Sequence, residues 1–440
     1  MKEGIQSSVA AIALRARAAS RLLARLSFSE RNEILIAAAK AIEGNRRKIL
    51  AANSLDCKAA EPAVASGKMS AAMFARLQVA DKGASEMAMR IREVAGLPDP
   101  LGRRLAATEL DDGLVLYRES CPLGVVGIVF ESRPDVVPQV ASLALKSANA
   151  VILKGGSEAA NTNEALVSIW RESLGNFPNV PPDAVNLLQT RADVLELLEL
   201  SGNVDLIIPR GSKALVEFVT MHSRIPVLGH GEGICHVYVD RAADIKKALD
   251  VTLDAKVQYP AVCNAAETLL VHEKIAGEFL PRIVSRLKEA GVEIRGCPKT
   301  IAISGRGNIK AATEEDWATE YGDLILSVKI VADLQEAIDH INLYGSRHTD
   351  AIVTEDADAA GRFMNEVDAA GVYQNASTRF ADGYRYGFGA ELGISTSKIH
   401  ARGPMGLEGL TTYKYKLYGS GHTVGEYARG EKKFKHRSLD

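Results

Sequence analysis

The fold of this chain is decided by one apolar run, Leu123-Gly124-Val125-Val126-Gly127-Ile128-Val129-Phe130. A helical pattern near 135–147 follows it, then a second apolar run at 150–153 and another helical pattern near 158–173. Two more such runs precede further helical stretches, at 184–188 and 204–208. Apolar strands that alternate with helices are typical of parallel βαβ units, because helices cover both faces of such a sheet. The sequence therefore predicts an α/β fold with a doubly wound parallel sheet.

Two loops with ligand-binding character follow the first two predicted strands. Ligands bind a doubly wound sheet at the carboxyl ends of its strands, where this chain has Glu131-Ser132-Arg133-Pro134-Asp135 and Lys154-Gly155-Gly156-Ser157-Glu158. Glycines let the backbone approach a ligand, and a lysine before a helix start suits a phosphate-bearing cofactor. The loop matches neither a P-loop nor GxGxxG. A later loop, Pro209-Arg210-Gly211-Ser212-Lys213, repeats this composition. One such loop alone is as typical of a plain turn with a surface cation, but two on one sheet favour a cofactor site.

A cysteine stands in a loop of small residues before another predicted strand, Gln258-Tyr259-Pro260-Ala261-Val262-Cys263-Asn264-Ala265-Ala266-Glu267-Thr268. Alanines leave room for a substrate, and the proline resists helix at the entry of the loop. Cys263 is therefore a candidate nucleophile, and the alternative is a buried small hydrophobe. The surrounding region, 232–372, has its own αβ pattern. It predicts a second α/β domain that carries the thiol.

Composition excludes several classes of protein. The 440 residues are 47% hydrophobic and 25% charged, with a net charge of −2, which argues against a dedicated nucleic-acid binder. The five cysteines lie far apart without CxxC or Cys/His spacing, so we expect neither a disulfide framework nor a metal site. The N-terminus has no signal-type apolar core, and no apolar run approaches the roughly eighteen residues of a membrane span. We expect no membrane contact and a cytoplasmic location.

The beginning and end of the chain have structural rather than chemical patterns. Residues 4 to about 95 are alanine-rich and helical, which is typical of packing. The stretch 113–120 alternates like a hairpin strand, and an exposed strand invites pairing with another subunit. The tail after residue 400 mixes lysines, tyrosines and glutamates and reads as exposed or subunit-capping. We predict that 108–122 and 400–440 are oligomerisation elements of a homo-oligomer, either a dimer or a tetramer.

Specific motifs carry a resemblance to a known family. Phe130-Glu131-Ser132-Arg133-Pro134-Asp135, and Cys263-Asn264 followed by Glu267-Thr268, resemble gamma-glutamyl phosphate reductases (glutamate-5-semialdehyde dehydrogenases), a branch of the aldehyde dehydrogenase superfamily. The resemblance covers nearly the whole chain. Its other parts are 144–163, 206–213, 227–240, 344–356, 375–380, 389–393 and 403–407.

The resemblance implies a reaction. It is the reduction of L-glutamate 5-phosphate by NADPH to L-glutamate 5-semialdehyde and phosphate, a step of proline biosynthesis. Cys263 would attack the acyl phosphate and hold the glutamyl group as a thioester that hydride then reduces. Asn264 and backbone N–H groups would hold the oxyanion. The alternative functions are those of an acylating or hydrolytic aldehyde dehydrogenase and of a non-enzymatic nucleotide-binding relative. The presence of Cys263 argues against the non-enzymatic relative.

The resemblance also implies binding roles. Arg133 is the candidate for the phosphate or carboxylate of the small-molecule substrate, and its alternative is structural pairing with Glu131 or Asp135. Ser377, Thr378 and Arg379 are candidates for the α-carboxylate, with a subunit contact as the alternative. Glu320 resembles the superfamily glutamate that holds the nicotinamide ribose, and its alternative is a solvated surface carboxylate. The other predicted cofactor-binding residues are Lys154, Gly155, Gly156, Ser157, Pro209, Arg210, Gly211 and Ser212.

The resemblance further implies a domain plan, a cofactor preference and a partner. Residues 1–107 and 123–231 would be the NADP-binding domain and 232–372 the catalytic thiol domain. NAD-preferring members tend to carry a carboxylate where this chain has Ser157, which predicts NADPH, although Glu158 beside it could point either way. No kinase domain precedes the reductase part, so glutamate 5-kinase is a candidate separate partner.

Some positions depart from the pattern that the resemblance predicts. Hydrolytic members carry a glutamate base at the start of a Glu-Leu-Gly-Gly stretch, and the matching position here is Gly229 or His230. Glu232 is displaced from it and reads as structural. We therefore expect phosphate, not water, to accept the glutamyl group. Ala266 and Gly322 are smaller than the expected apolar residues.

Overall fold

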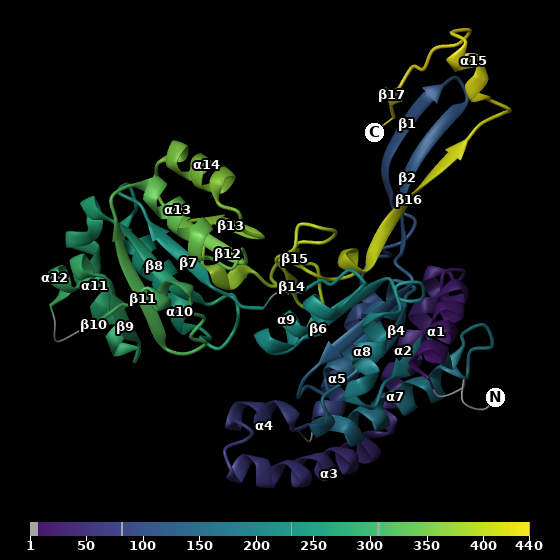
Figure 1. The fold of residues 1–440 in the computed structure, drawn as a ribbon, viewed down its shortest axis with the longest axis horizontal. Coiled ribbons are helices and arrows are strands. Elements are labelled where there is room, and N and C mark those ends of the chain that lie inside the picture. The colour runs from purple at the N-terminus through teal and green to yellow at the C-terminus, as the bar shows by residue number, and fades with distance from the viewer. Residues whose placement is uncertain (1–7, 81, 230, 306–308, 440) are drawn as a thin grey trace. The chain divides into compact units, whose positions relative to one another are not determined.

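The computed structural model of the protein describes residues 8–80, 82–229, 231–305 and 309–439 (Figure 1). The chain forms two compact units. Unit 1 comprises 1–228, 389–392 and 405–440, and unit 2 comprises 229–388 and 393–404. The assignment of a cofactor domain and a thiol domain to these units stays a prediction. Unit 2 extends past the predicted limit of 372 because the strand Gly371–Gln374 completes its sheet and the next segment binds the cysteine loop.

Unit 1 contains the predicted doubly wound sheet, which is confirmed. Its four parallel strands have the order β5-β4-β3-β6. The chain runs outward from β3 to β5 and then returns to the other side of β3 as β6, so β3 and β6 flank a topological switch point, where ligands bind. The elements in chain order are β3 (Val125–Phe130), α6 (Val136–Lys146), β4 (Ala150–Lys154), η1 (Ser157–Ala159), α7 (Ala160–Leu174), η2 (Pro182–Ala184), β5 (Val185–Leu187), α8 (Arg191–Leu198), β6 (Leu206–Arg210) and α9 (Lys213–His222).

The helical N-terminal region precedes this sheet, as predicted. A capping box begins the second helix: the Ser27 side chain accepts from the backbone N–H of Glu30, and the Glu30 carboxylate accepts from the backbone N–H of Ser27. The last helix buries one apolar face, including Met87 and Ile91. The helices are α1 (Val9–Leu23), α2 (Phe28–Gly44), α3 (Arg46–Ala65), α4 (Ala71–Leu77) and α5 (Gly83–Gly96).

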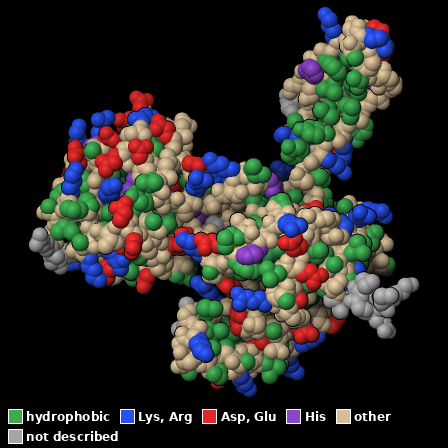
Figure 2. Space-filling view, in the orientation of Figure 1, with side chains coloured by type: hydrophobic (Ala, Val, Ile, Leu, Met, Phe, Trp, Pro, Cys, Tyr) green, Lys and Arg blue, Asp and Glu red, His purple; other side chains and the backbone are tan. Residues whose placement is uncertain are grey.

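Unit 1 also contains an antiparallel sheet of order β16-β2-β1-β17. Its strands are β1 (Arg104–Asp111), β2 (Leu114–Pro122), β16 (Thr411–Tyr418) and β17 (Arg437–Ser438). The edge strand β16 exposes Tyr415 and Leu417, which are 61% and 56% accessible. Hydrophobic side chains gather on this sheet at the top right of Figure 2. An edge strand with exposed aromatic residues is suited to pairing with another chain.

Unit 2 is built on a seven-stranded parallel sheet of order β10-β9-β11-β8-β7-β12-β13. Its elements are β7 (Cys235–Val239), α10 (Ile245–Val257), β8 (Ala266–His272), α11 (Glu273–Glu289), β9 (Glu293–Gly296), α12 (Pro298–Ser304), β10 (Lys310–Ala311), η3 (Glu315–Ala318), β11 (Ile325–Val331), α13 (Leu334–Tyr344), β12 (Thr349–Val353), α14 (Ala357–Glu366), β13 (Gly371–Gln374) and η4 (Thr378–Phe380). The predicted αβ alternation of this region is confirmed.

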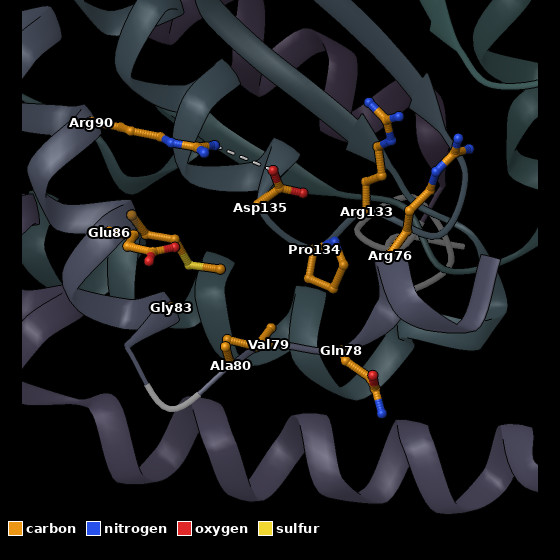
Figure 3. Close-up of a pocket in the computed structure, with 11 residues that line it drawn as sticks. Arg76, Gln78, Val79, Ala80, Gly83, Glu86, Arg90, Arg133, Pro134 and Asp135 are labelled. Carbon is orange, nitrogen blue, oxygen red and sulfur yellow. Dashed lines mark hydrogen bonds and ion pairs between the residues drawn. The ribbon is translucent and has the colours of Figure 1, made fainter. Parts of the chain in front are cut away.

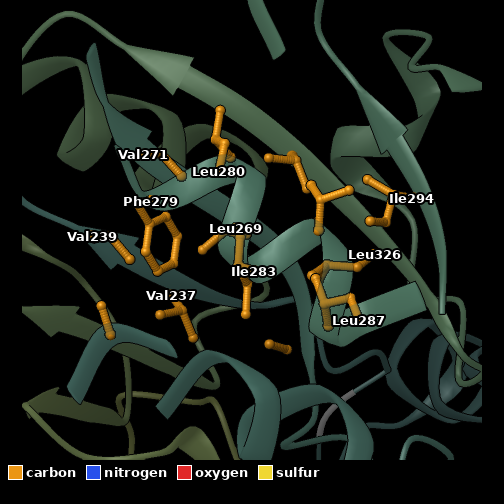
Figure 4. Close-up of a cluster of buried hydrophobic side chains, with 14 of the residues drawn as sticks. Val237, Val239, Leu269, Val271, Phe279, Leu280, Ile283, Leu287, Ile294 and Leu326 are labelled. Atoms are coloured by element: carbon orange, nitrogen blue, oxygen red, sulfur yellow. The ribbon is translucent and has the colours of Figure 1, made fainter. Parts of the chain in front are cut away.

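The core of unit 2 fixes the strands that carry the cysteine loop. Figure 4 shows Val237 and Leu269 of the central strands with Phe279 and Ile283 of α11, and all four are fully buried. Burying each such side chain contributes about 1.5–3 kcal/mol. None of the helices in the described residues is long and apolar enough to cross a membrane.

Candidate active site

Two carboxylates tie together the three loops that follow β3, β4 and β6 in unit 1. Glu131 accepts a hydrogen bond from the backbone N–H of Ser212, the N-cap of α9, at 2.8 Å. Glu158 accepts from the backbone N–H of Ser132 at 2.7 Å and from its hydroxyl at 2.6 Å. Ser132 has a φ of 39°, a conformation that non-glycine residues seldom adopt. The Glu131–Asp135 motif therefore joins the two predicted cofactor loops.

Glycines in these loops leave room for the carboxylates. A Cβ on Gly156 would lie 2.1 Å from Glu158 Oε1, and a Cβ on Gly211 would lie 2.3 Å from Glu131 Oε2. These glycines therefore let the two carboxylates pack closely inside the loops, and a larger residue would displace the carboxylates. Their contact with a cofactor stays a prediction.

Arg133 is left available by these interactions. Glu131 binds Ser212 and Asp135 pairs with Arg90 at 3.4 Å, so neither carboxylate pairs with Arg133. Within the described part of the chain, the side chain of Arg133 makes no hydrogen bond or ion pair, and its backbone carbonyl accepts from the backbone N–H of Val136. The structural pairing that was the alternative for this residue is therefore absent, and its role as a ligand-binding cation stays a prediction.

The Lys154 loop has a buried cation beside an exposed serine. The Lys154 ammonium donates to the carbonyl oxygen of Gly155, and burial lowers the pKa of Lys154. Ser157 is exposed. Glu158, whose direction the sequence left open, points to Ser132. The carboxylate next to Ser157 in the sequence, that of Glu158, is therefore hydrogen-bonded within the protein. Pro209 and Arg210 end β6 beside the last residues of β3.

The backbone of Cys263 is held by two neighbours in unit 2. Cys263 is half-buried in the loop between α10 and β8, and the loop is closed by a hydrogen bond from Ala265 N to Val262 O of 2.9 Å. A Cβ on Gly233 would lie 2.0 Å from the carbonyl oxygen of Cys263. The thiol of Cys235 donates to that carbonyl at 3.3 Å, and burial raises the pKa of Cys235 well above its usual value. The position of the candidate nucleophile is therefore fixed by direct backbone packing.

The η4 segment braces the residue after the cysteine. Thr378 Oγ1 donates to the carbonyl oxygen of Asn264 at 2.7 Å, and Asn264 Nδ2 donates to the carbonyl oxygen of Ala381 at 2.8 Å. Asn264 and Thr378 are both buried. These bonds explain a positioning role for both residues, whereas their contacts with an oxyanion or an α-carboxylate stay predictions.

Arg379 brings a positive charge near the thiol. Its Nε donates to Gln258 Oε1 at 2.9 Å, and the hydroxyl of Ser377 accepts from its backbone N–H at 3.3 Å. Burial lowers the pKa of Arg379, while the negative charge of an ionised Cys263 opposes that shift. The interaction is mutual, so the guanidinium favours the thiolate. The structure thus brings Cys263, Asn264 and the 377–379 segment together, whereas Arg133 belongs to unit 1.

A buried ion pair lies beneath the cysteine loop. Lys256 and Glu267 are both fully buried and 2.6 Å apart, and Glu267 also accepts from the backbone N–H of Gly322 at 3.2 Å. Burial raises the pKa of Glu267 to about 7 and lowers that of Lys256, while the ion pair opposes both shifts. Gly322 has a φ of 59°, which explains why a glycine stands where a larger residue was expected. Ala266 is buried at the start of β8.

Glu320 contacts the same glycine as the cysteine does. Its carboxylate accepts from the backbone N–H of Gly233, and burial and then the charge of Glu232 raise its pKa. Glu232 is half-buried. His230 lies outside the described residues. Glu320 is therefore anchored beside the cysteine loop, and its role toward a ribose stays a prediction.

Comparisons with known proteins identify the family of the chain. The aldehyde dehydrogenase family profile matches residues 1–300. A gamma-glutamyl phosphate reductase of Synechococcus sp. (strain JA-3-3Ab) is 53% identical over 96% of this chain and 92% of its own length. The Natronomonas pharaonis gamma-glutamyl phosphate reductase is 53% identical over 97% of this chain and 96% of its own length. The chain belongs to the gamma-glutamyl phosphate reductase family.

The structure of the Thermotoga maritima gamma-glutamyl phosphate reductase has a TM-score of 0.91 at 44% identity, covering 95% of this chain and all of that chain. Membership confirms the aldehyde dehydrogenase-like fold and makes the protein an oxidoreductase with a nicotinamide cofactor.

Sequence reasoning missed several residues of this reductase site. Gly233 follows the position of the absent hydrolytic base, and no local pattern marks it. Its contact with Cys263 depends on tertiary structure. Glu158 appeared only as a neighbour of Ser157, and Lys256 lies in a helix without a local motif. Glu267 was visible as part of a specific motif. A charged residue at the start of an apolar strand is a usable signal for a buried ion pair.

Proposed function

We propose that this protein reduces L-glutamate 5-phosphate to L-glutamate 5-semialdehyde and phosphate with NADPH, in proline biosynthesis. The observation that carries the proposal is the half-buried Cys263, held by Gly233 and by the Thr378–Asn264 bond in a chain whose relatives are named gamma-glutamyl phosphate reductases. Holding a nucleophile in one geometry accelerates attack on a bound substrate.

The chain's residues account for the covalent steps. The Cys263 thiolate, favoured by the charge of Arg379, attacks the acyl carbon, forms an S–C bond and expels phosphate. The product of this step is a thioester on Cys263. Hydride addition to its carbonyl carbon would give a hemithioacetal oxyanion, which collapses to the aldehyde as the S–C bond breaks and the Cys263 thiolate is restored. Backbone N–H groups of the Asn264 loop would stabilise the oxyanion.

NADPH would supply the hydride, and the loops of unit 1 fit such a cofactor. Two of them follow β3 and β6, which flank the switch point, and the third follows Lys154 at the end of the neighbouring strand β4. Ser157 offers no repulsion to a 2′-phosphate, because it is neutral and exposed. Glu158 is bound to Ser132 and so does not take the place of a ribose-binding carboxylate. In this proposal Pro209–Ser212 also contact the cofactor, and Glu320 contacts its nicotinamide ribose.

Phosphate rather than water would accept the glutamyl group in the reverse direction. Gly229, one of the two residues at the position of the hydrolytic base, has no side chain to act as a base. Glu232 is displaced from that position by two or three residues and is followed by glycine. Without a positioned base, water attack loses the ~10² to 10⁴ that such catalysis supplies. Phosphate is an anion at neutral pH and needs little deprotonation.

We further propose a cytoplasmic homo-oligomer, a dimer or a tetramer, that pairs through the exposed strand β16 and receives its substrate from glutamate 5-kinase. Arg133 and the 377–379 segment would bind the charged groups of the substrate. The direct test of the function is incubation of the purified protein with glutamate 5-semialdehyde, phosphate and NADP⁺. The absorbance of the reduced cofactor should rise, and no rise would remove the proposal.

A further inference from the structure

Unit 1 has a cavity of about 290 Å³ between α4, α5 and the loop after β3 (Figure 3). The buried residues Gly83, Met87 and Pro134 form part of its lining, and charged side chains surround them. Gly83 lets the side chain of Val79 pack closely against it, because a Cβ on Gly83 would lie 2.6 Å from that side chain. The size suits a small polar molecule rather than a whole dinucleotide, since ligand pockets usually measure about 300–1,000 Å³.

The charges that line this cavity are only partly satisfied within the protein. Arg90 and Asp135 form an ion pair at 3.4 Å. Arg76, Arg133 and Glu86, by contrast, make no side-chain hydrogen bond or ion pair with the residues that the structure describes. Figure 3 shows Arg76 and Arg133 extending in the same direction from different elements, with Glu86 on α5 across the cavity. The lining thus presents two cations and one anion that have no side-chain partner among the described residues.

We infer that this cavity recognises the charged groups of the substrate, with Arg76 and Arg133 binding an anionic group and Glu86 binding the α-ammonium group. The inference rests on the proposed function. It adds Arg76 and Glu86 to the site and restricts the substrate to α-amino acids that carry a second anionic group. Two guanidinium groups match the oxygens of a phosphate or a carboxylate.

The two signs of charge favour an amino acid over a nucleotide. A nucleotide phosphate would be attracted by the arginines but would gain nothing from Glu86. A zwitterion with a further anion uses all three side chains. The apolar surface of Pro134 and Met87 would contact the methylene groups between the charged ends. The anion held by the arginines is either the phosphate group or the α-carboxylate, and kinetics can separate them.

The experiment measures phosphate-dependent NADP⁺ reduction, in which phosphate and semialdehyde are separate substrates. Loss of a charge-assisted hydrogen bond costs about ten- to a hundred-fold in affinity. We expect Arg76→Ala to raise the KM for phosphate or the KM for glutamate semialdehyde by that factor, and the substrate affected identifies the anion. Glu86→Gln should lower the ratio of kcat/KM for glutamate semialdehyde to that for 5-oxopentanoate, its analogue without the amino group, by about tenfold.

Control variants lie on α5, the helix that carries Glu86, but outside the cavity. Arg92→Ala and Glu93→Gln remove the same charges from α5 and should leave both KM values and the ratio unchanged. Unchanged KM values in Arg76→Ala, or an unchanged ratio in Glu86→Gln, would overturn the inference. That outcome differs from failure of the proposed function, in which the unaltered protein would not reduce NADP⁺ at all.

Discussion

The loops of unit 1 and the cysteine loop of unit 2 are held in different ways. In unit 1, the carboxylates of Glu131 and Glu158 reach across the carboxyl edge of the sheet and bind loop N–H groups. In unit 2, the backbone of Cys263 packs directly against the backbone of Gly233. A side-chain tie can shift by rotation of the side chain, whereas backbone packing changes only when the loop itself moves. The difference suits reversible binding in unit 1 and a fixed nucleophile in unit 2.

The largest effect should come from the nucleophile itself. Cys263→Ala removes the atom that forms the thioester in the proposed mechanism, so turnover should be abolished, while binding of NADPH, which we propose for unit 1, should stay near normal. Steady-state kinetics and titration of cofactor fluorescence measure the two properties. Substantial residual turnover would remove Cys263 from the mechanism.

The buried ion pair beneath the cysteine loop should control the stability of unit 2. Lys256→Met leaves Glu267 as an uncompensated buried charge and should reduce the free energy of unfolding by about 3–5 kcal/mol. Urea unfolding at pH 8 measures this, since the intact protein then holds Glu267 mostly ionised beside Lys256, whereas loss of Lys256 raises the pKa of Glu267 further and forces the buried carboxylate to stay unpaired or take up a proton. Lys256→Met combined with Glu267→Leu should recover much of the loss.

The exposed pair of Lys247 and Glu355 provides the control. Lys247→Met should change the unfolding midpoint little, because water solvates the remaining carboxylate. If Lys256→Met and Lys247→Met reduced the free energy of unfolding equally, burial would not determine how much an ion pair contributes to stability.

Glycine substitutions compare the two kinds of loop directly. In Gly233→Ala the new Cβ meets backbone, so the cysteine loop must move, and kcat should fall by about 10² because a shift of about 1 Å misplaces the nucleophile. In Gly156→Ala the new Cβ meets the end of the Glu158 side chain, which can rotate away. That variant should keep kcat and change mainly the KM for NADPH. A larger loss of kcat in Gly156→Ala than in Gly233→Ala would contradict the comparison.

The smallest effect should be on cofactor choice. Ser157→Glu places a carboxylate where a 2′-phosphate would bind, so the preference for NADPH over NADH should fall about ten- to a hundred-fold. The ratio of kcat/KM for the two cofactors measures it. Equal use of NADPH and NADH by the unaltered protein would count against the NADPH assignment.

Local patterns predicted the fold well, and tertiary contacts explain what they missed. The apolar runs at 123–130 and 150–153 lie within or next to observed strands, because a buried parallel strand must be apolar along its length. Specific motifs also made Cys263 the candidate nucleophile, which stays a prediction. Gly233, by contrast, acts through a contact with a residue thirty positions away, which no local pattern encodes.

The loops illustrate the same limit. The sequence left the partners of Arg133 open, and only the structure shows that Glu131 and Asp135 bind elsewhere. Arg76 and Glu86 lie in a helical region that was read as packing, and they line a cavity only because α4 and α5 approach the loop after β3.

The central claim is that a thioester on Cys263 exchanges with phosphate and not with water. NADP⁺ reduction by glutamate semialdehyde should be followed in phosphate-free buffer and again after addition of phosphate or arsenate. The account predicts that steady-state turnover requires one of these anions, with little activity in their absence. Equal rates with and without them would show that water is the acceptor, and that this protein is a hydrolytic aldehyde dehydrogenase.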